Sequence, residues 1–222
     1  MTTVLVTGGA SGLGAAVMGR LGADAVSLDR HPPAAAADHE LVDLGDGDAV
    51  EAAVGRVLAR RGSIDAVVTA AGTDACGPLA EVPRHRWEQV VAVNLLGTAA
   101  VVRAALPELE RVGGRVVTVA STLGLRALPD ATAYCASKFG VVGFTRALAA
   151  ELAGRVGVTL LIPGGMRTAF FDGRDPQYRP PDDAKLNSPD NVAAAIVFAL
   201  SQPTGCELRE LVIAPSTEPS WP

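Results

Sequence analysis

Short runs of aliphatic and β-branched residues alternate along the chain with longer segments whose apolar positions recur at helical spacing. The short runs predict seven strands, and the longer segments predict the helices that connect them. The predicted strands lie at residues 3–7, 25–29, 40–42, 64–70, 114–120, 157–162 and 210–214, and the predicted helices at 12–21, 46–61, 83–111, 133–152 and 188–200. This alternation is typical of an α/β fold, here a doubly wound parallel sheet of about seven strands with helices on both faces.

Two segments interrupt the alternation. The link from His31 to Asp38 contains two prolines and is too short for a full crossover helix. Residues 177–188 contain two further prolines and follow the carboxyl end of a predicted strand, the edge at which open α/β sheets bind ligands. We therefore predict a mobile lid here and assign residues 165–188 to a substrate-binding region.

Length and composition exclude several classes of protein. A chain of 222 residues can bury a full core, so we expect one domain, residues 1–222. The chain has 49% hydrophobic and 19% charged residues, a composition that excludes disorder. Its net charge of −5 argues against a nucleic-acid partner.

We also expect no membrane contact and a cytoplasmic location, because the chain starts without a basic targeting segment and its longest apolar stretch, residues 90–102, is too short to span a bilayer. The three cysteines form no CxxC pair and the three histidines lack metal-ligand spacing, so we expect no metal.

A glycine-rich turn connects the first predicted strand to the first helix. It reads Thr7-Gly8-Gly9-Ala10-Ser11-Gly12-Leu13-Gly14. Gly8 permits the tight turn, Gly12 lets a pyrophosphate approach the backbone, and Gly14 allows close packing of helix on strand. Free N–H groups at the helix start can then hold the phosphates of a dinucleotide. An ordinary glycine-rich turn is the alternative.

Asp29 ends the second predicted strand, where a carboxylate can accept both ribose hydroxyls of an adenosine. The same carboxylate opposes the extra phosphate of NADP, because two like charges about 4 Å apart cost about 4 kcal/mol at an effective dielectric near 20. We therefore predict NAD, with NADP possible because the neighbouring Arg30 can bind a phosphate. Asp43 can bond the adenine amino group, or it can simply cap the following helix.

Tyr134 and Lys138 stand four residues apart and share one face of a predicted helix. An ammonium roughly 6 Å from the phenol lowers its pKa by about two units, and a positively charged nicotinamide lowers it further. Burial instead raises the pKa of the phenol, so both charges are expected to be needed for it to exchange a proton with a substrate near pH 7. Elsewhere such a Tyr–Lys pair is usually a surface contact.

Two further polar residues accompany this pair. Ser121 ends a predicted strand, where its hydroxyl can hold a substrate oxygen. Asn94 interrupts an apolar helical run, and a buried asparagine needs partners, which a water bridge to Lys138 can supply.

With these residues the chain resembles the classical short-chain dehydrogenase/reductase family over nearly its full length. The matching motifs, in order, are Thr7-Gly8…Gly12-Leu13-Gly14, Ala70-Ala71-Gly72, Asn94, Ser121, Tyr134…Lys138, and Pro163-Gly164 with Thr168. The resemblance implies a single Rossmann-type, NAD(P)-binding domain that interconverts an alcohol and a ketone or aldehyde by hydride transfer. It also implies a homodimer or homotetramer assembled through the helices at 83–111 and 133–152.

The resemblance implies a role for each matching residue. Tyr134 is the general acid/base, Ser121 orients the substrate oxygen, Lys138 binds the nicotinamide ribose, and Asn94 holds a water of a proton relay. The cofactor-binding set is Thr7, Gly8, Ser11, Gly12, Leu13, Gly14, Asp29, Arg30, Asp43, Leu44, Ala71, Gly72, Tyr134, Lys138, Pro163, Gly164 and Thr168. One departure is Thr69, which stands where the family usually has an asparagine, and whose hydroxyl replaces only part of an amide's bonding.

Two other functions compete with this interpretation. A non-catalytic NAD(P)-binding sensor or scaffold usually lacks one of Ser121, Tyr134 or Lys138, and all three are present. A sugar-nucleotide epimerase or dehydratase usually needs a larger C-terminal domain.

The substrate pocket is expected between residues 73–78, 122–128 and 165–178, and to be mainly apolar. Its apolar residues are predicted to be Leu123, Leu125, Leu128, Phe170 and Phe171. Three arginines, Arg126, Arg167 and Arg174, can pair with a substrate carboxylate or phosphate, but exposed surface positions are the expectation for them. The Pro-rich tail after residue 215 is expected to fray or to pack on a neighbouring subunit.

Overall fold

The computed structural model describes residues 2–34 and 37–221, and its centre is one seven-stranded sheet. The strands lie side by side in the order β3-β2-β1-β4-β5-β6-β7, and every neighbouring pair is parallel. Their bounds are β1 Val4–Thr7, β2 Ala25–Asp29, β3 His39–Leu41, β4 Ala66–Thr69, β5 Arg115–Val119, β6 Gly157–Pro163 and β7 Glu210–Ile213. The predicted parallel sheet is confirmed, with strand ends within two or three residues of the predicted ones.

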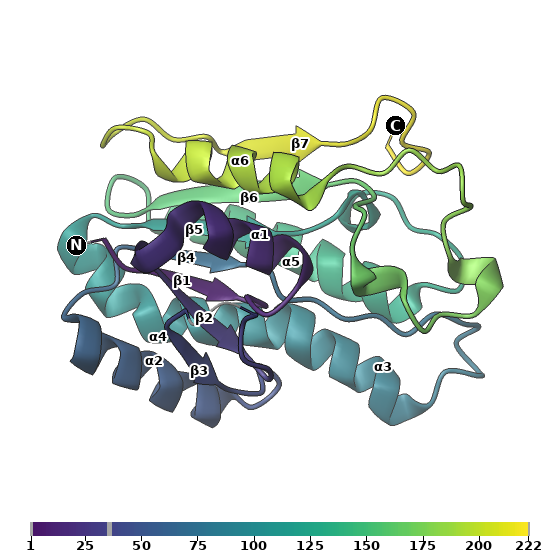
Figure 1. Cartoon of the computed structure of the whole chain (residues 1–222), viewed down its shortest axis with the longest axis horizontal. Helices are drawn as coiled ribbons and strands as arrows, with labels where there is room; N and C mark the ends of the chain where they lie inside the picture. The colour runs from purple at the N-terminus through teal and green to yellow at the C-terminus, as the bar shows by residue number, and fades with distance from the viewer. Residues whose placement is uncertain (1, 35–36, 222) are drawn as a thin grey trace.

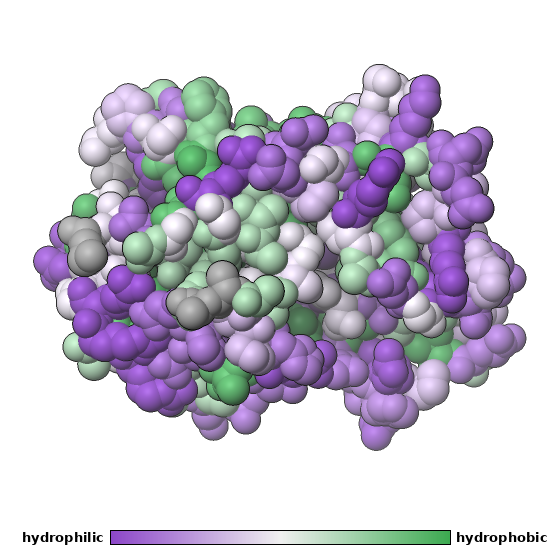
Figure 2. Space-filling view, in the orientation of Figure 1, coloured by the Kyte–Doolittle hydropathy of each residue, from purple (hydrophilic) through white to green (hydrophobic). Residues whose placement is uncertain are grey.

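Helices cover both faces of the sheet, as predicted (Figure 1). On one face α1 (Gly12–Leu21) packs beside α6 (Pro189–Leu200), where Val17 and Ile196 are fully buried against strand residues such as Val6. On the other face lie α2 (Gly47–Arg61), α4 (Gly97–Val112) and α5 (Thr132–Glu151). Figure 2 shows weakly hydrophobic residues over α1 and hydrophilic ones over α2.

The long helix predicted at residues 83–111 forms, but it changes from α-helical to π-helical and back along its length. Pro83 is the N-cap rather than a first-turn residue, and α3 (Arg84–Val91) is joined to α4 by a π-helical segment, η2 (Ala92–Leu96). The full span from Arg84 to Val112 is long and apolar enough, by length and composition alone, to cross a membrane. Packing explains this composition, because Val101, Val102 and other apolar residues of α4 are buried against the sheet.

Residues 165–188 form a closed loop at the carboxyl edge of the sheet. An isolated bridge between Met166 and Asn187 joins its two ends, and it contains two short 3-10 turns, η4 (Ala169–Phe171) and η5 (Pro176–Tyr178). In Figure 1 the loop lies beyond the arrowheads of the strands, on the side that also holds the C-terminus. Ser188 is the N-cap of α6 and accepts a hydrogen bond from the Asp190 N–H.

The link between β2 and β3 contains no helix at residues 31–34 or 37–38, in keeping with the predicted short link. Residues 35 and 36 of that link lie outside the described residues. Two other 3-10 turns lie in the described residues: η1 (Gly22–Asp24) precedes β2, and η3 (Thr122–Gly124) follows β5.

Candidate active site

A cleft of about 1450 Å³ opens where the strands end. Its walls come from segments that directly follow β1, β2, β4, β5 and β6, because parallel strands bring their carboxyl ends to one edge. Most of the predicted site residues line it: Gly8, Ser11, Gly12, Leu13, Asp29, Arg30, Asp43, Leu44, Ala71, Gly72, Ser121, Tyr134, Lys138, Pro163, Gly164 and Thr168. The fold thus gathers residues that are far apart in the sequence.

The glycine turn has the geometry of a dinucleotide cradle. Gly8 has a φ of 74°, and a Cβ there would lie 2.8 Å from the Ala71 Cα. A Cβ on Gly14 would lie 2.1 Å from the Gly8 carbonyl oxygen, so this glycine permits the predicted close packing. Gly12, with a φ of 53°, faces the cleft, and the N-cap Ser11 makes no side-chain capping bond. The N–H groups at the start of α1 are therefore available to phosphates, and the residues present fit a dinucleotide.

Asp29 joins the end of β2 to this turn. Its carboxylate accepts hydrogen bonds from the Ala10 N–H at 3.1 Å and the His31 N–H at 3.0 Å, and it lines the cleft. Asp43 lines the cleft as well but does not cap α2. It accepts a local bond from the Gly45 N–H at 2.9 Å, and Asp46 is the N-cap.

Tyr134 and Lys138 project from α5 into the cleft beside Ser121, which follows β5. The Lys138 Nζ lies 5.7 Å from the centroid of the Tyr134 ring and donates a 2.9 Å hydrogen bond to the Val119 carbonyl. The Ser121 Oγ accepts a bond from the Leu123 N–H at 3.1 Å, which fixes the hydroxyl at the strand end. These three side chains therefore meet at one wall of the cleft, as the sequence predicts.

Burial dominates the electrostatics of this group. It raises the pKa of the Tyr134 phenol to about 12, an effect that the nearby Ser121 hydroxyl only partly opposes. It also lowers the pKa of the Lys138 ammonium to about 8. Lys138 alone therefore does not lower the pKa of the Tyr134 phenol to near 7, because the desolvation of the two groups outweighs the attraction between ammonium and phenolate.

Asn94 lies behind the cleft, buried in the π-helical segment. Its amide accepts from the Thr73 N–H at 2.8 Å and donates to the Thr73 carbonyl at 2.9 Å and the Ser137 Oγ at 3.0 Å. The protein itself thus supplies the partners for which the sequence suggested a water bridge. The amide ties the loop after β4 to α5, the helix that carries Tyr134.

Thr7 also lies behind the cleft, and its Oγ1 accepts a 3.0 Å bond from the Ala71 N–H. The hydroxyl of Thr69 is buried and has no hydrogen-bond partner among the described residues. This agrees with the expectation that a threonine replaces only part of the bonding of an asparagine at that position.

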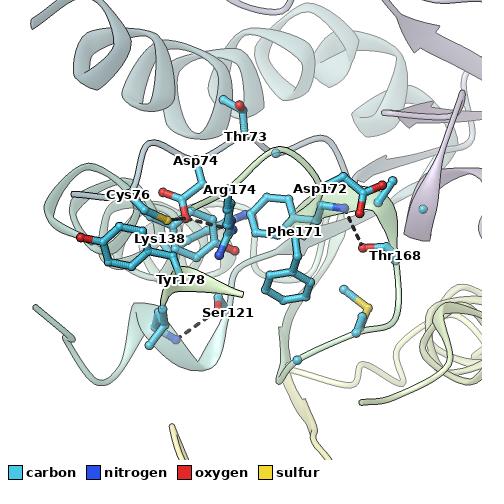
Figure 3. A pocket seen from close by; sticks show the side chains of 18 of the residues that line it. Thr73, Asp74, Cys76, Ser121, Lys138, Thr168, Phe171, Asp172, Arg174 and Tyr178 are labelled. Carbon is cyan, nitrogen blue, oxygen red and sulfur yellow. Dashed lines mark hydrogen bonds and ion pairs between the residues drawn. The ribbon is translucent and has the colours of Figure 1, made fainter. Parts of the chain in front are cut away.

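The substrate side of the cleft differs from the predicted apolar pocket. Leu123, Leu128, Phe170 and Phe171 line it, but Leu125 packs against the core instead. Arg174, expected on the surface, lines the cleft and forms an ion pair with Asp74 at 3.0 Å (Figure 3). No local sequence signal marks this pair, since the two residues come from different loops. Arg126 and Arg167 are exposed, as expected.

The C-terminal tail folds back over the cleft of its own chain. The Glu218 carboxylate accepts a 2.8 Å bond from the Gly165 N–H, and the Ser220 Oγ lies 2.7 Å from the Thr122 Oγ1. The tail therefore contacts the loops after β5 and β6, which carry Ser121 and Gly164. The described tail is therefore held by its own chain instead of fraying, and its packing on a neighbouring subunit stays a prediction.

Cys76, at the cleft, is not a thiolate. Burial and the adjacent Asp74 raise the pKa of its thiol to about 12.

Within residues 2–34 and 37–221, no group of three or more histidine, cysteine, aspartate or glutamate side chains is placed to hold a metal ion.

Comparison with known proteins places the chain among dehydrogenases. Residues 2–179 match the short chain dehydrogenase family. The D-threitol dehydrogenase of Mycolicibacterium smegmatis is 35% identical, over 89% of this chain and 85% of that protein. The 2-dehydro-3-deoxy-L-rhamnonate dehydrogenase (NAD(+)) of a Sphingomonas species is 38% identical, over 76% and 73%.

Solved structures agree at the level of the fold. The aldohexose dehydrogenase of Thermoplasma acidophilum, in ligand-free form, superposes with a TM-score of 0.85 at 24% identity, covering 96% of this chain and 92% of that one. A short-chain dehydrogenase from Streptomyces avermitilis gives a TM-score of 0.81 at 26% identity, covering 96% and 87%. The chain belongs to the short-chain dehydrogenase family and is an oxidoreductase that acts on CH–OH groups.

Proposed function

We propose that the protein interconverts an alcohol and a ketone or aldehyde with a nicotinamide cofactor, using Tyr134 as the general acid/base. The observation that carries this proposal is the meeting of Tyr134, Ser121 and Lys138 at one wall of a cleft whose other end is the glycine turn. Ser121 orients the substrate oxygen, and Lys138 holds the nicotinamide ribose. The names of the two relatives, which refer to D-threitol and to 2-dehydro-3-deoxy-L-rhamnonate, support a small-molecule substrate.

The phenol performs a different task in each direction. The bound nicotinamide supplies or accepts the hydride and, when oxidised, adds a positive charge to the cleft. With a pKa of about 12, the Tyr134 phenol is neutral at pH 7 and can donate its proton to a carbonyl oxygen during reduction. During oxidation it must instead accept the alcohol proton, which requires the phenolate. The Lys138 ammonium favours that phenolate through its positive charge.

We propose NAD as the cofactor, held in part by Asp29. The carboxylate lines the cleft at the end of β2, where it would lie against the extra phosphate of NADP. The relative from Sphingomonas is named as an NAD(+) enzyme, which supports this choice. The exposed Arg30 next to it is the group that would favour NADP.

We further propose that residues 165–188 form the substrate-binding lid. Thr168, Phe170 and Arg174 of this loop line the cleft, and the Phe170 ring packs against that of Tyr134. The bridge between Met166 and Asn187 closes the base of the loop, so it can move as a unit about that base.

Tyr134→Phe tests the assignment, because it removes the phenolic hydroxyl and keeps the ring. Turnover of an alcohol and ketone panel should fall by at least a thousandfold, while NADH binding, followed by fluorescence titration, stays within about twofold of wild type. Retained turnover would remove Tyr134 from the acid/base role. A wild-type protein that binds NADH but turns over no member of the panel would instead support a non-catalytic sensor.

A further inference from the structure

An ion pair between Asp74 and Arg174 lies in the substrate half of the cleft. The two side chains are only 8% and 15% exposed, and Asp74 Oδ2 lies 3.0 Å from Arg174 Nη2. Asp74 comes from the loop after β4 and Arg174 from residues 165–188. Figure 3 shows the two groups facing each other, with Cys76 beside the carboxylate and Phe171 beside the guanidinium. The pair is thus enclosed, and it does not form part of the dinucleotide cradle.

Aromatic rings hold the guanidinium close to the reacting phenol. The Arg174 Cζ lies 4.6 Å from the centroid of the Phe170 ring and 4.7 Å from that of Phe171. Phe170 in turn packs against Tyr134, with 5.6 Å between ring centroids. The Phe170 ring thus contacts both the Tyr134 ring and the guanidinium, so the ion pair lies on the part of the cleft next to the reacting phenol.

The pair retains hydrogen-bonding capacity. Although it is close to Asp74, the Arg174 Nη2 makes no aligned hydrogen bond with any described residue, and it is buried. Besides the Arg174 contact, Asp74 Oδ2 accepts a 3.3 Å hydrogen bond from the Cys76 thiol, and Oδ1 accepts one from the Ala75 N–H at 2.7 Å. A buried donor without a partner carries a desolvation cost that a bound polar group can remove.

The chemistry of the pair selects among ligands. A substrate carboxylate would be attracted by Arg174 but repelled by Asp74, so the pair gives it little net advantage. An apolar substrate would leave the Nη2 donor unsatisfied and shielded from water. A hydroxyl group matches both partners, because its oxygen accepts from Arg174 while its proton is donated to Asp74.

We propose that the Asp74–Arg174 pair binds a hydroxyl group next to the reacting carbon, so that the substrates are diols, polyols or hydroxy ketones. This inference rests on the proposed function, since it defines the substrate relative to Tyr134. A site built to hydrogen-bond a substrate hydroxyl discriminates strongly against the analogue that lacks it.

Three four-carbon alcohols test the proposal in the wild-type protein. They are butan-2-ol, butane-2,3-diol and 3-hydroxybutanoate, each assayed as all stereoisomers with saturating cofactor. We expect kcat/KM for the diol to exceed that for butan-2-ol and for the carboxylate by roughly ten- to a hundredfold. Equal values for diol and mono-alcohol, or a preference for the carboxylate, overturn the proposal and leave the proposed function standing. Absence of turnover with every alcohol and ketone overturns the proposed function itself.

Variants separate hydroxyl recognition from a merely structural ion pair between two loops. Asp74→Asn and Arg174→Lys preserve size or charge, and each should lower kcat/KM for the diol about tenfold or more while changing that for butan-2-ol less than threefold. Arg20→Gln, which breaks an ion pair with Asp190 far from the cleft, is the matched control and should change neither value. A variant that lowers kcat/KM equally for the diol and for butan-2-ol shows that the pair only positions the loops, and this outcome overturns the proposal.

Discussion

At the scale of single residues, the two central groups of the site depart from their ordinary pKa values in opposite directions. Tyr134 is harder to ionise than a free phenol, and Lys138 loses its proton more easily than a free ammonium. Both shifts have the same cause, because burial disfavours the charged form of each group. The free protein is therefore set for proton donation, and oxidation requires additional positive charge beside the phenol.

Ultraviolet titration can detect this change, since the chain has two tyrosines, Tyr134 and Tyr178. In the difference between wild type and Tyr134→Phe, we expect no phenolate absorbance from Tyr134 at pH 10 without cofactor, because its pKa is about 12. Saturating NAD should generate phenolate at that pH. Alcohol oxidation should accordingly rise with pH from 7 to about 8, where the Lys138 ammonium still carries its charge, whereas carbonyl reduction should not. A Tyr134 already ionised at pH 9 without cofactor would contradict the assignment.

Cofactor choice is expected to depend on one side chain as well. Asp29→Ala removes the carboxylate that opposes a 2′-phosphate, and it also removes bonds to the Ala10 and His31 N–H groups. We expect weaker binding of NAD. The kcat/KM with NAD, divided by that with NADP, should fall at least tenfold. Asp24→Ala, at a carboxylate outside the cleft, is a suitable control. An unchanged ratio would assign the selection to Arg30 or another group.

At the scale of elements, the π-helical segment η2 connects the loop after β4 to α5. Asn94 makes three hydrogen bonds with groups of Thr73 and Ser137. Such π segments often occur at functional sites. Here the segment supports the site from behind, because Asn94 itself does not line the cleft.

Asn94→Ala should therefore act mainly on stability. It leaves the Thr73 N–H and carbonyl without their Asn94 partner, while the Ser137 hydroxyl keeps its bond to the Tyr134 carbonyl, so we expect the free energy of unfolding to fall by about 2 kcal/mol. Denaturant unfolding measures this value, with the exposed Asn191→Ala on α6 as control. A loss of activity with unchanged stability would instead favour the proton-relay role implied by the family.

At the scale of the whole molecule, the C-terminal tail returns from β7 to close the cleft. Glu218 holds the Gly165 N–H, and Ser220 reaches Thr122, so one short segment connects the loops that follow two neighbouring strands. A Cβ on Gly164 would lie 2.4 Å from a Glu218 oxygen, which shows how closely the carboxylate packs on this loop. The tail thus stabilises the wall proposed to contact the nicotinamide.

Glu218→Ala should loosen this wall. We expect a stability loss of about 2 kcal/mol, the usual value for charge-assisted hydrogen bonds, together with a severalfold weaker binding of NADH. Glu51→Ala, at an exposed carboxylate on α2, is the matched control. If both quantities stay at wild-type values, the tail contacts do not contribute to cofactor binding.

We propose assembly through α4 and α5, as the family implies. Small residues line an exposed face of α5 at Ala136, Gly143 and Ala147, and Phe139 is 44% exposed nearby. Close helix packing needs such small residues, so Gly143→Arg should convert a dimer or tetramer into smaller species, as measured by light scattering. Gly19→Arg, on the exposed side of α1, should not. A monomeric wild-type protein would contradict this proposal.

The sequence by itself determined the sheet, the order of its elements and the residues that we propose as the catalytic group. These follow from local patterns: alternating apolar runs, the glycine turn after β1, and the spacing of Tyr134 and Lys138 on one helix. Strand ends then bring such residues together, because every strand of a parallel sheet points to the same edge.

Only the tertiary structure decided which side chains meet between loops. Asp74 and Arg174, or Glu218 and Gly165, come from segments without periodic pattern, and nothing in their local sequence specifies a partner far along the chain. The pKa shift of Tyr134 also depends on burial, which the spacing to Lys138 does not reveal. The sequence therefore selects the residues that we propose for the cofactor cradle and for catalysis, and most of them line one cleft, whereas the substrate wall is formed by long-range contacts that exist only in the folded chain.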